Sequence, residues 1–112
     1  MPFETTYTTS EPTRAEIDAS EAPTLIEFGT PWCGWCRAAQ PLIASALADH
    51  PGVRHLKVED GSGRRLGRSF GVKLWPTLLF VNRGEEIARL VRPGDRGAIA
   101  QALDRIDGSP AP

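Results

Sequence analysis

The chain has 112 residues, of which 40% are apolar and 24% are charged. This is the composition of an ordinary globular domain, and it excludes a disordered chain. We expect one domain over residues 1–108 and a flexible tail over residues 109–112. The thirteen Lys and Arg and the fourteen Asp and Glu leave a net charge of -1. Such a charge provides no field that would attract nucleic acid or an anionic membrane.

No segment has the pattern of a membrane span or of a secretion signal. The longest apolar run covers residues 78–81, far short of the ~20 residues that a spanning helix needs. Residues 1–10 have neither the basic start nor the apolar centre of a signal peptide. We therefore expect a cytoplasmic protein. A periplasmic or secreted location is the alternative, because a chain whose signal peptide has been removed would look the same.

In the first half of the chain, strand and helix patterns alternate. A polar, Thr-rich start predicts an edge strand around residues 6–9 and a short helix over residues 13–19. The compact apolar run 24–29 lies between two prolines and predicts a buried strand. Apolar residues then recur at three- and four-residue spacing over residues 33–49, as in an amphipathic helix. Residues 53–59 predict the next strand.

The second half of the chain predicts a short helix, a β-hairpin and a last helix. Ser62 is expected to cap the short helix. The runs 76–82 and 85–91 flank an Asn-Arg-Gly turn and predict the hairpin. Asp95 is expected to cap the last helix, which ends near Ile106. Together these elements predict an α/β fold with a mixed central sheet flanked by helices.

The two cysteines of the chain, Cys33 and Cys36, form a single Cys-x-x-Cys pair. Two cysteines are too few for a disulfide-stapled secreted scaffold. A domain of this size also does not need a disulfide across so short a loop for its stability. The preceding strand places Cys33 at the start of a helix, where unpaired backbone N–H groups favour an anionic thiolate. Cys36 lies one turn further along the same face. We therefore expect Cys33 to be a nucleophile and Cys36 to be the thiol that resolves its mixed disulfide.

The same cysteines also fit the spacing of a zinc site. With His50 and His55 they form Cys-x₂-Cys-x₁₃-His-x₄-His, the spacing of a site with two cysteines and two histidines. A zinc finger, however, carries its histidines on one helix after a hairpin. Here the Pro-Gly pair at residues 51–52 interrupts the chain between the histidines. We therefore expect no metal at these residues.

Three motifs in register resemble the thioredoxin family. The first is the strand 25–28 leading into Trp-Cys-Gly-Trp-Cys at residues 32–36, with Pro41 five residues later. The second is the run 70–77, which matches the segment where thioredoxins hold a cis-proline opposite the active site. The third is the hairpin turn at residues 80–84. The resemblance covers about residues 24–106 and implies the thioredoxin fold.

The resemblance also implies a role for each matched residue. Cys33 matches the exposed nucleophile of the family, and Cys36 matches its buried resolving cysteine. Pro76 matches the cis-proline, which would leave the backbone of Trp75 free to pair with a substrate strand. Glu27 stands where the family carries a buried Asp that shuttles the proton of the resolving thiol. A solvent-facing strand glutamate is the alternative for Glu27.

Several residues depart from the family pattern. The dipeptide between the cysteines is Gly34-Trp35, where typical thioredoxins have Gly-Pro, and Gly29 replaces a usual Trp. His55 falls where a Lys is common. Because histidine titrates near neutral pH, His55 would make the exchange pH-dependent if it lies close to Glu27. An exposed strand histidine is the alternative.

All three tryptophans of the chain, Trp32, Trp35 and Trp75, fall close to the expected site. A tryptophan that fills the core would be expected elsewhere, among the apolar faces of helices and strands. We expect these three, together with Gly34 and Pro76, to form a docking surface for extended polypeptide. Core packing is the alternative.

We therefore expect a thiol–disulfide oxidoreductase that reduces protein disulfides through Cys33 and Cys36 and needs no cofactor. The resemblance implies disulfide-containing proteins as substrates and a flavin- and NADPH-dependent thioredoxin reductase as electron donor. A monomer is expected. Two alternatives stay open. One is a disulfide oxidant or isomerase with a less negative potential, and the other is a redox-inactive adaptor that binds peptides.

Overall fold

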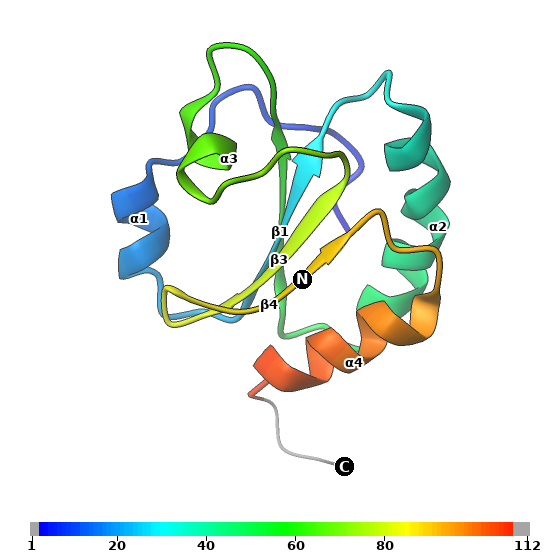
Figure 1. Ribbon diagram of the computed structural model, residues 1–112. Helices are drawn as coiled ribbons and strands as arrows, with labels where there is room; N and C mark the ends of the chain where they lie inside the picture. Colours follow the sequence, from blue (N-terminus) through cyan, green and yellow to red (C-terminus); the bar gives the residue numbers. More distant parts are fainter. Residues whose placement is uncertain (1–2, 109–112) are drawn as a thin grey trace.

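The computed structural model describes residues 3–108, whose helices and strands form three layers (Figure 1). The middle layer is a four-stranded sheet in the order β2-β1-β3-β4. Helices α2 and α4 cover one face of this sheet, and helices α1 and α3 cover the other. The strands are β1 (Thr24–Gly29), β2 (Arg54–Glu59), β3 (Thr77–Asn82) and β4 (Glu85–Val91). The helices are α1 (Arg14–Ala19), α2 (Gly34–Leu47), α3 (Arg65–Ser69) and α4 (Arg96–Ile106).

The sheet is mixed. Strand β1 runs parallel to β2 and antiparallel to β3, and β4 is antiparallel to β3. This architecture confirms the predicted α/β class with a mixed sheet flanked by helices. In the register of the sheet, Glu27 pairs with Lys57 on β2 and with Leu78 on β3. Glu27 therefore lies in the middle of the sheet rather than at an edge.

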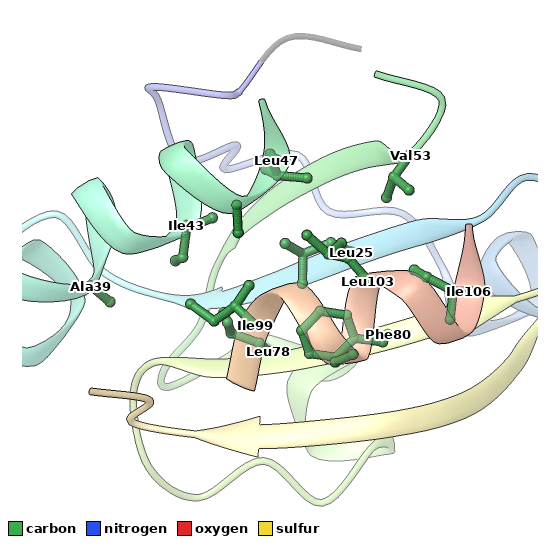
Figure 2. Close-up of a cluster of buried hydrophobic side chains, with 12 residues drawn as sticks. Leu25, Ala39, Ile43, Leu47, Val53, Leu78, Phe80, Ile99, Leu103 and Ile106 are labelled. Atoms are coloured by element: carbon green, nitrogen blue, oxygen red, sulfur yellow. The ribbon is translucent and has the colours of Figure 1, made fainter. Parts of the chain in front are cut away.

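The core between the sheet and the pair α2 and α4 determines which way Glu27 points. Figure 2 shows Leu25 and Phe80 of the sheet packed against Ile43 of α2 and Leu103 of α4. All four side chains are fully buried. Because side chains alternate along a strand, Glu27 faces the same side as Leu25. The carboxyl group is thus directed toward α2, the helix that carries the cysteines.

Local sequence signals place the helix starts at both ends of the chain. Thr13 caps α1 through a capping box with Glu16, and Asp95 caps α4 through bonds to two backbone N–H groups. Such bonds satisfy donors that a helix leaves unpaired at its start. The predicted helices over residues 13–19 and from Asp95 onward are confirmed, as are the four predicted strands over residues 24–29, 53–59, 76–82 and 85–91.

Two local predictions are wrong. The expected edge strand over residues 6–9 is a single bridge between Thr8 and Val58. The chain turns away from the sheet after Thr8. The Thr8 hydroxyl accepts a hydrogen bond from the backbone N–H of Ser10, and this local bond competes with the backbone hydrogen bonds of a strand pair. The second error concerns α3, whose N-cap is Arg64 and not Ser62.

The start of α3 is capped by a residue far away in the sequence. Glu11 Oε1 accepts from the backbone N–H groups of Arg65 (2.8 Å) and Leu66 (3.3 Å). A carboxylate satisfies these unpaired N–H groups as well as a local cap would.

The tail expected over residues 109–112 lies outside the described residues. Within residues 3–108, no helix is both long and apolar enough to cross a membrane.

Candidate active site

The two cysteines lie where the chain leaves β1 and enters α2. Cys33 is the N-cap residue of α2, and its sulfur accepts a hydrogen bond from the backbone N–H of Cys36 at 3.2 Å. Both thiols are free. Cys33 is 8% exposed and Cys36 is 1% exposed. The helix start therefore offers its N–H groups to a thiolate on Cys33, which is the more exposed of the two cysteines.

Cys36 is held as a neutral thiol behind Cys33. Burial and, to a lesser extent, the hydrogen bond with Cys33 raise the pKa of Cys36 from 9.0 to about 12. The backbone N–H of Thr30 and the hydroxyl of Tyr7 offset part of this rise in the pKa. At neutral pH the Cys36 thiol therefore keeps its proton. It must lose that proton before its sulfur is able to attack a disulfide.

This difference predicts selective alkylation of the reduced protein. We expect iodoacetamide to modify Cys33 and to leave Cys36 unmodified at neutral pH, as read by peptide mass spectrometry. Folding raises the pKa of Cys36, so the free energy of unfolding also depends on pH. The contribution of this thiol to that free energy is complete below pH 9.0 and is lost as the pH rises toward about 12. Equal labelling of both cysteines in the folded protein would contradict the expectation.

Glu27 is fully buried, so the interpretation as a solvent-facing strand residue is wrong. Its Oε1 lies 2.9 Å from His55 Nε2. Its Oε2 accepts from Gln40 Nε2 at 2.8 Å and from the Tyr7 hydroxyl at 3.3 Å. Buried carboxylates are stable only when they are hydrogen-bonded in this way. Glu27 is therefore an acceptor held in place by three side chains.

His55 is buried too, which rules out the exposed strand histidine. The ring is 4% exposed and stacks on Phe3 with 5.2 Å between ring centroids. His55 Nδ1 accepts the backbone N–H of Glu4 at 2.9 Å. The hydrogen of a neutral ring must then sit on Nε2, which donates it to Glu27. His55 thus meets the condition of lying close to Glu27.

Two further residues of this network were missed in the sequence. Lys57 Nζ donates to Gln40 Oε1 at 2.6 Å, and Gln40 Nε2 reaches both Glu27 and the carbonyl of Cys36. Lys57 is 5% exposed. Lys57 follows His55 by two residues, so both side chains lie on the same face of the strand. The alternation of side chains along a strand could therefore have revealed Lys57 from the sequence. Gln40 lies one helical turn after Cys36, and this spacing could have revealed in the same way that the two residues share a helix face.

The tryptophans lie at the rim of the site and not in the core. Trp32 and Trp35 are 71% and 59% exposed. The Trp32 ring meets that of Trp75 edge to face, with centroids 5.7 Å apart, and Trp75 Nε1 donates to Asp60 Oδ2 at 2.9 Å. Gly34 is exposed between the cysteines. These rings leave apolar surface beside Cys33, as a docking surface requires.

Pro76 and Trp75 line the other side of Cys33. The Trp75–Pro76 peptide bond is cis. The Trp75 carbonyl lies 3.9 Å from Cys33 Sγ and accepts from Arg92 Nε at 2.8 Å. The Arg92 guanidinium also lies over the Trp35 ring, 5.0 Å from its centroid. Arg92, which the sequence did not reveal, therefore joins the two tryptophans.

The four residues with zinc-like spacing contact different partners. His50 binds Asp107 and Asp104, whereas His55 binds Glu27. Among residues 3–108, the structure groups no three His, Cys, Asp or Glu side chains so that they would hold a metal ion. The two cysteines instead contact each other through the hydrogen bond from the Cys36 N–H to Cys33 Sγ, and Gln40 of the buried polar network binds the Cys36 carbonyl.

The site consists of a cysteine at a helix start and a more deeply buried thiol one turn behind it, on an α/β scaffold. This arrangement is typical of proteins that carry out thiol–disulfide exchange. The family model for thioredoxin matches residues 4–105. The chain belongs to the thioredoxin family, whose members are thiol–disulfide oxidoreductases.

Individual relatives agree with this assignment. Thioredoxin 2 from Pseudomonas aeruginosa, solved in its reduced form, is 55% identical and superposes with a TM-score of 0.85, over 95% of this chain and 98% of that one. A thioredoxin from Chlamydia muridarum is 30% identical over 72% of this chain and 79% of its own length. A chloroplast thioredoxin, M5 from rice, is 30% identical over 80% of this chain. The chain spans about half, 53%, of the length of that rice protein.

Proposed function

We propose that this protein reduces disulfide bonds in protein substrates by dithiol–disulfide exchange. The observation that carries the proposal is the difference between the two thiols. Cys33, the more exposed of the two at 8%, accepts a backbone hydrogen bond at the helix start, whereas Cys36 is 1% exposed and holds its proton. A dithiol reductant needs one sulfur that attacks a substrate and one that stays protected until the mixed disulfide has formed.

The reaction has two displacements. The Cys33 thiolate attacks one sulfur of the substrate disulfide and forms a mixed disulfide, while the other substrate sulfur leaves as a thiolate. Cys36 then loses its proton to Glu27 and attacks Cys33 Sγ. The second substrate sulfur leaves with the electron pair, and Cys33 and Cys36 remain joined as a disulfide. A reductase of the thioredoxin reductase type would return the two electrons.

The docking surface for the substrate consists of Trp32, Gly34, Trp35, Trp75 and Pro76. Trp32, Gly34 and Trp35 are exposed, Trp75 is half-buried and Pro76 is buried beside it, and the exposed rings suit an extended polypeptide better than a compact ligand. Such a segment would pack its side chains on the indoles and bring its disulfide to the Cys33 sulfur.

The direction of electron flow is tested by the reduction potential. We expect equilibration with glutathione buffers, followed by Trp fluorescence, to give a potential near about -270 mV, as for a reductant. A value above about -200 mV would instead assign the protein as an oxidant or isomerase. If no disulfide forms between Cys33 and Cys36 under any buffer, the redox function is excluded and the peptide-binding adaptor takes its place.

A further inference from the structure

One polar group at the site has no task in the mechanism above, the hydroxyl of Tyr7. Tyr7 directly precedes the bridge between Thr8 and Val58. Thr8 N–H donates to the Lys57 carbonyl at 2.7 Å, and Glu59 N–H donates to the Thr8 carbonyl at 3.1 Å. The half-buried Tyr7 ring also lies beside Lys57 Nζ, 4.6 Å from the ring centroid. These contacts fix the segment against the outer strand β2.

The Tyr7 hydroxyl lies between Cys36 and Glu27. It donates to Glu27 Oε2 at 3.3 Å and lies beside the Cys36 thiol. A Cβ atom on Gly29 would lie 2.9 Å from Tyr7 Oη and 2.6 Å from Cys36 Sγ. Both atoms therefore converge over Gly29, and a residue with a side chain would take the space that they occupy. The phenol oxygen contacts both groups between which the proton must move.

The other groups around the Cys36 thiol are unable to take its proton. Cys36 is 1% exposed, and neutral water is too weak a base to compete for this proton at neutral pH. The backbone N–H of Thr30 is a donor only. The sulfur of Cys33 is bonded to substrate at this stage. Among the contacts that the structure describes for Cys36, Tyr7 Oη is the one that accepts a proton while giving up another.

Glu27 is prepared to receive that proton. His55 Nε2, Gln40 Nε2 and the Tyr7 hydroxyl all point hydrogens at its two oxygens. These contacts hold the carboxyl group in one orientation, with Oε2 within reach of the Tyr7 hydroxyl. Lys57, bonded to Gln40, places a positive charge behind the same network.

We propose that Tyr7 relays the proton of the resolving thiol to Glu27, an inference that rests on the proposed disulfide exchange. The Cys36 S–H gives its proton to Tyr7 Oη while the Tyr7 O–H gives its own to Glu27 Oε2. The Cys36 sulfur forms its bond to Cys33 Sγ as the bond from Cys33 to the substrate sulfur breaks. The electron pair leaves with the substrate thiolate, the proton stays on Glu27, and Tyr7 returns to its initial state.

The test separates the two displacements in one experiment. Reduced protein is mixed with Ellman's reagent, an aromatic disulfide, in a stopped-flow instrument. Attack by Cys33 releases one coloured thiolate, and resolution by Cys36 releases the second. We expect Tyr7→Phe to leave the first phase unchanged and to slow the second at least about tenfold at neutral pH. This deficit shrinks as the pH rises, because hydroxide then takes the Cys36 proton directly.

Thr6→Ala, at the exposed neighbouring position, is the matched control and should change neither phase. A second phase that Tyr7→Phe leaves unchanged, or slows by the same factor at every pH, would overturn the relay and leave the proposed function intact. If the wild-type protein releases no second thiolate, the proposed function itself fails and the relay with it.

Because Tyr7 is the only tyrosine of the chain, a second form of the protein tests the relay without a change of shape. Biosynthetic incorporation of ring-fluorinated tyrosine alters this residue alone and makes its hydroxyl more acidic. We expect the fluorinated protein to keep the fast second phase that Tyr7→Phe loses, with its pH profile displaced. If the pH profile of the second phase is not displaced in the fluorinated protein, the relay is contradicted. This test does not depend on whether Tyr7→Phe folds.

Discussion

Replacing Cys36 with serine is expected to stop the reaction at the mixed disulfide between Cys33 and its substrate. Cys33 keeps its place at the start of α2, and the backbone N–H at position 36 still reaches its sulfur. A serine hydroxyl is unable to resolve a disulfide, so turnover should fall about 10³-fold or more, the scale of losing a reacting nucleophile. Mass spectrometry of the protein after mixing with a disulfide-containing protein should show the covalent adduct.

Cys33→Ser is the matched control, because it removes the attacking sulfur and leaves the buried one. We expect this variant to lose turnover to the same extent and to form no adduct, since Cys36 is 1% exposed and holds its proton. An adduct on Cys36 in this variant, or turnover in either variant close to that of the wild type, would contradict the assigned order of attack.

The second large effect concerns stability, at the centre of the core in Figure 2. Phe80→Ala removes a fully buried ring packed between β3 and the helices α2 and α4. We expect the free energy of unfolding to fall by about 3–5 kcal/mol. A domain of this size has only about 5–15 kcal/mol in total, so the change should be plain in urea unfolding followed by circular dichroism.

Leu74→Ala is the control for that experiment, because Leu74 is apolar but 49% exposed. Substitutions at such positions usually change stability by no more than about 0.5 kcal/mol. A loss for Phe80→Ala no larger than the loss for Leu74→Ala would contradict the placement of Phe80 in the core.

Local patterns were sufficient for most of the fold and for the reacting sulfurs. The compact apolar run of β1 and the Asp95 cap of α4 depend on neighbours within a few residues, so the sequence itself contains them. The spacing of Cys33 and Cys36 likewise fixes that both thiols lie on one face at a helix start. These features were predicted because short-range geometry determines them.

Predictions failed where a competing hydrogen bond replaced the expected local structure. Ser62 had the chemistry of a helix cap, but Glu11 binds the first N–H groups of α3 from across the fold. Residues 6–9 had the pattern of a strand, but Thr8 forms one bridge and the chain then turns. In both cases a competing hydrogen bond decided the outcome, and local propensity is too weak to exclude such competition.

The sequence by itself determined a dithiol at the start of a helix on an α/β scaffold, together with a carboxylate six residues before the first sulfur. Only the tertiary structure decided the surroundings of that carboxylate. Glu27 meets His55 from β2, Gln40 from α2 and Tyr7 from the N-terminal segment. These residues are 13 to 28 positions from Glu27 in the chain. Packing of sheet, helix and segment brings them together, because a buried charge must find its partners wherever the fold supplies them.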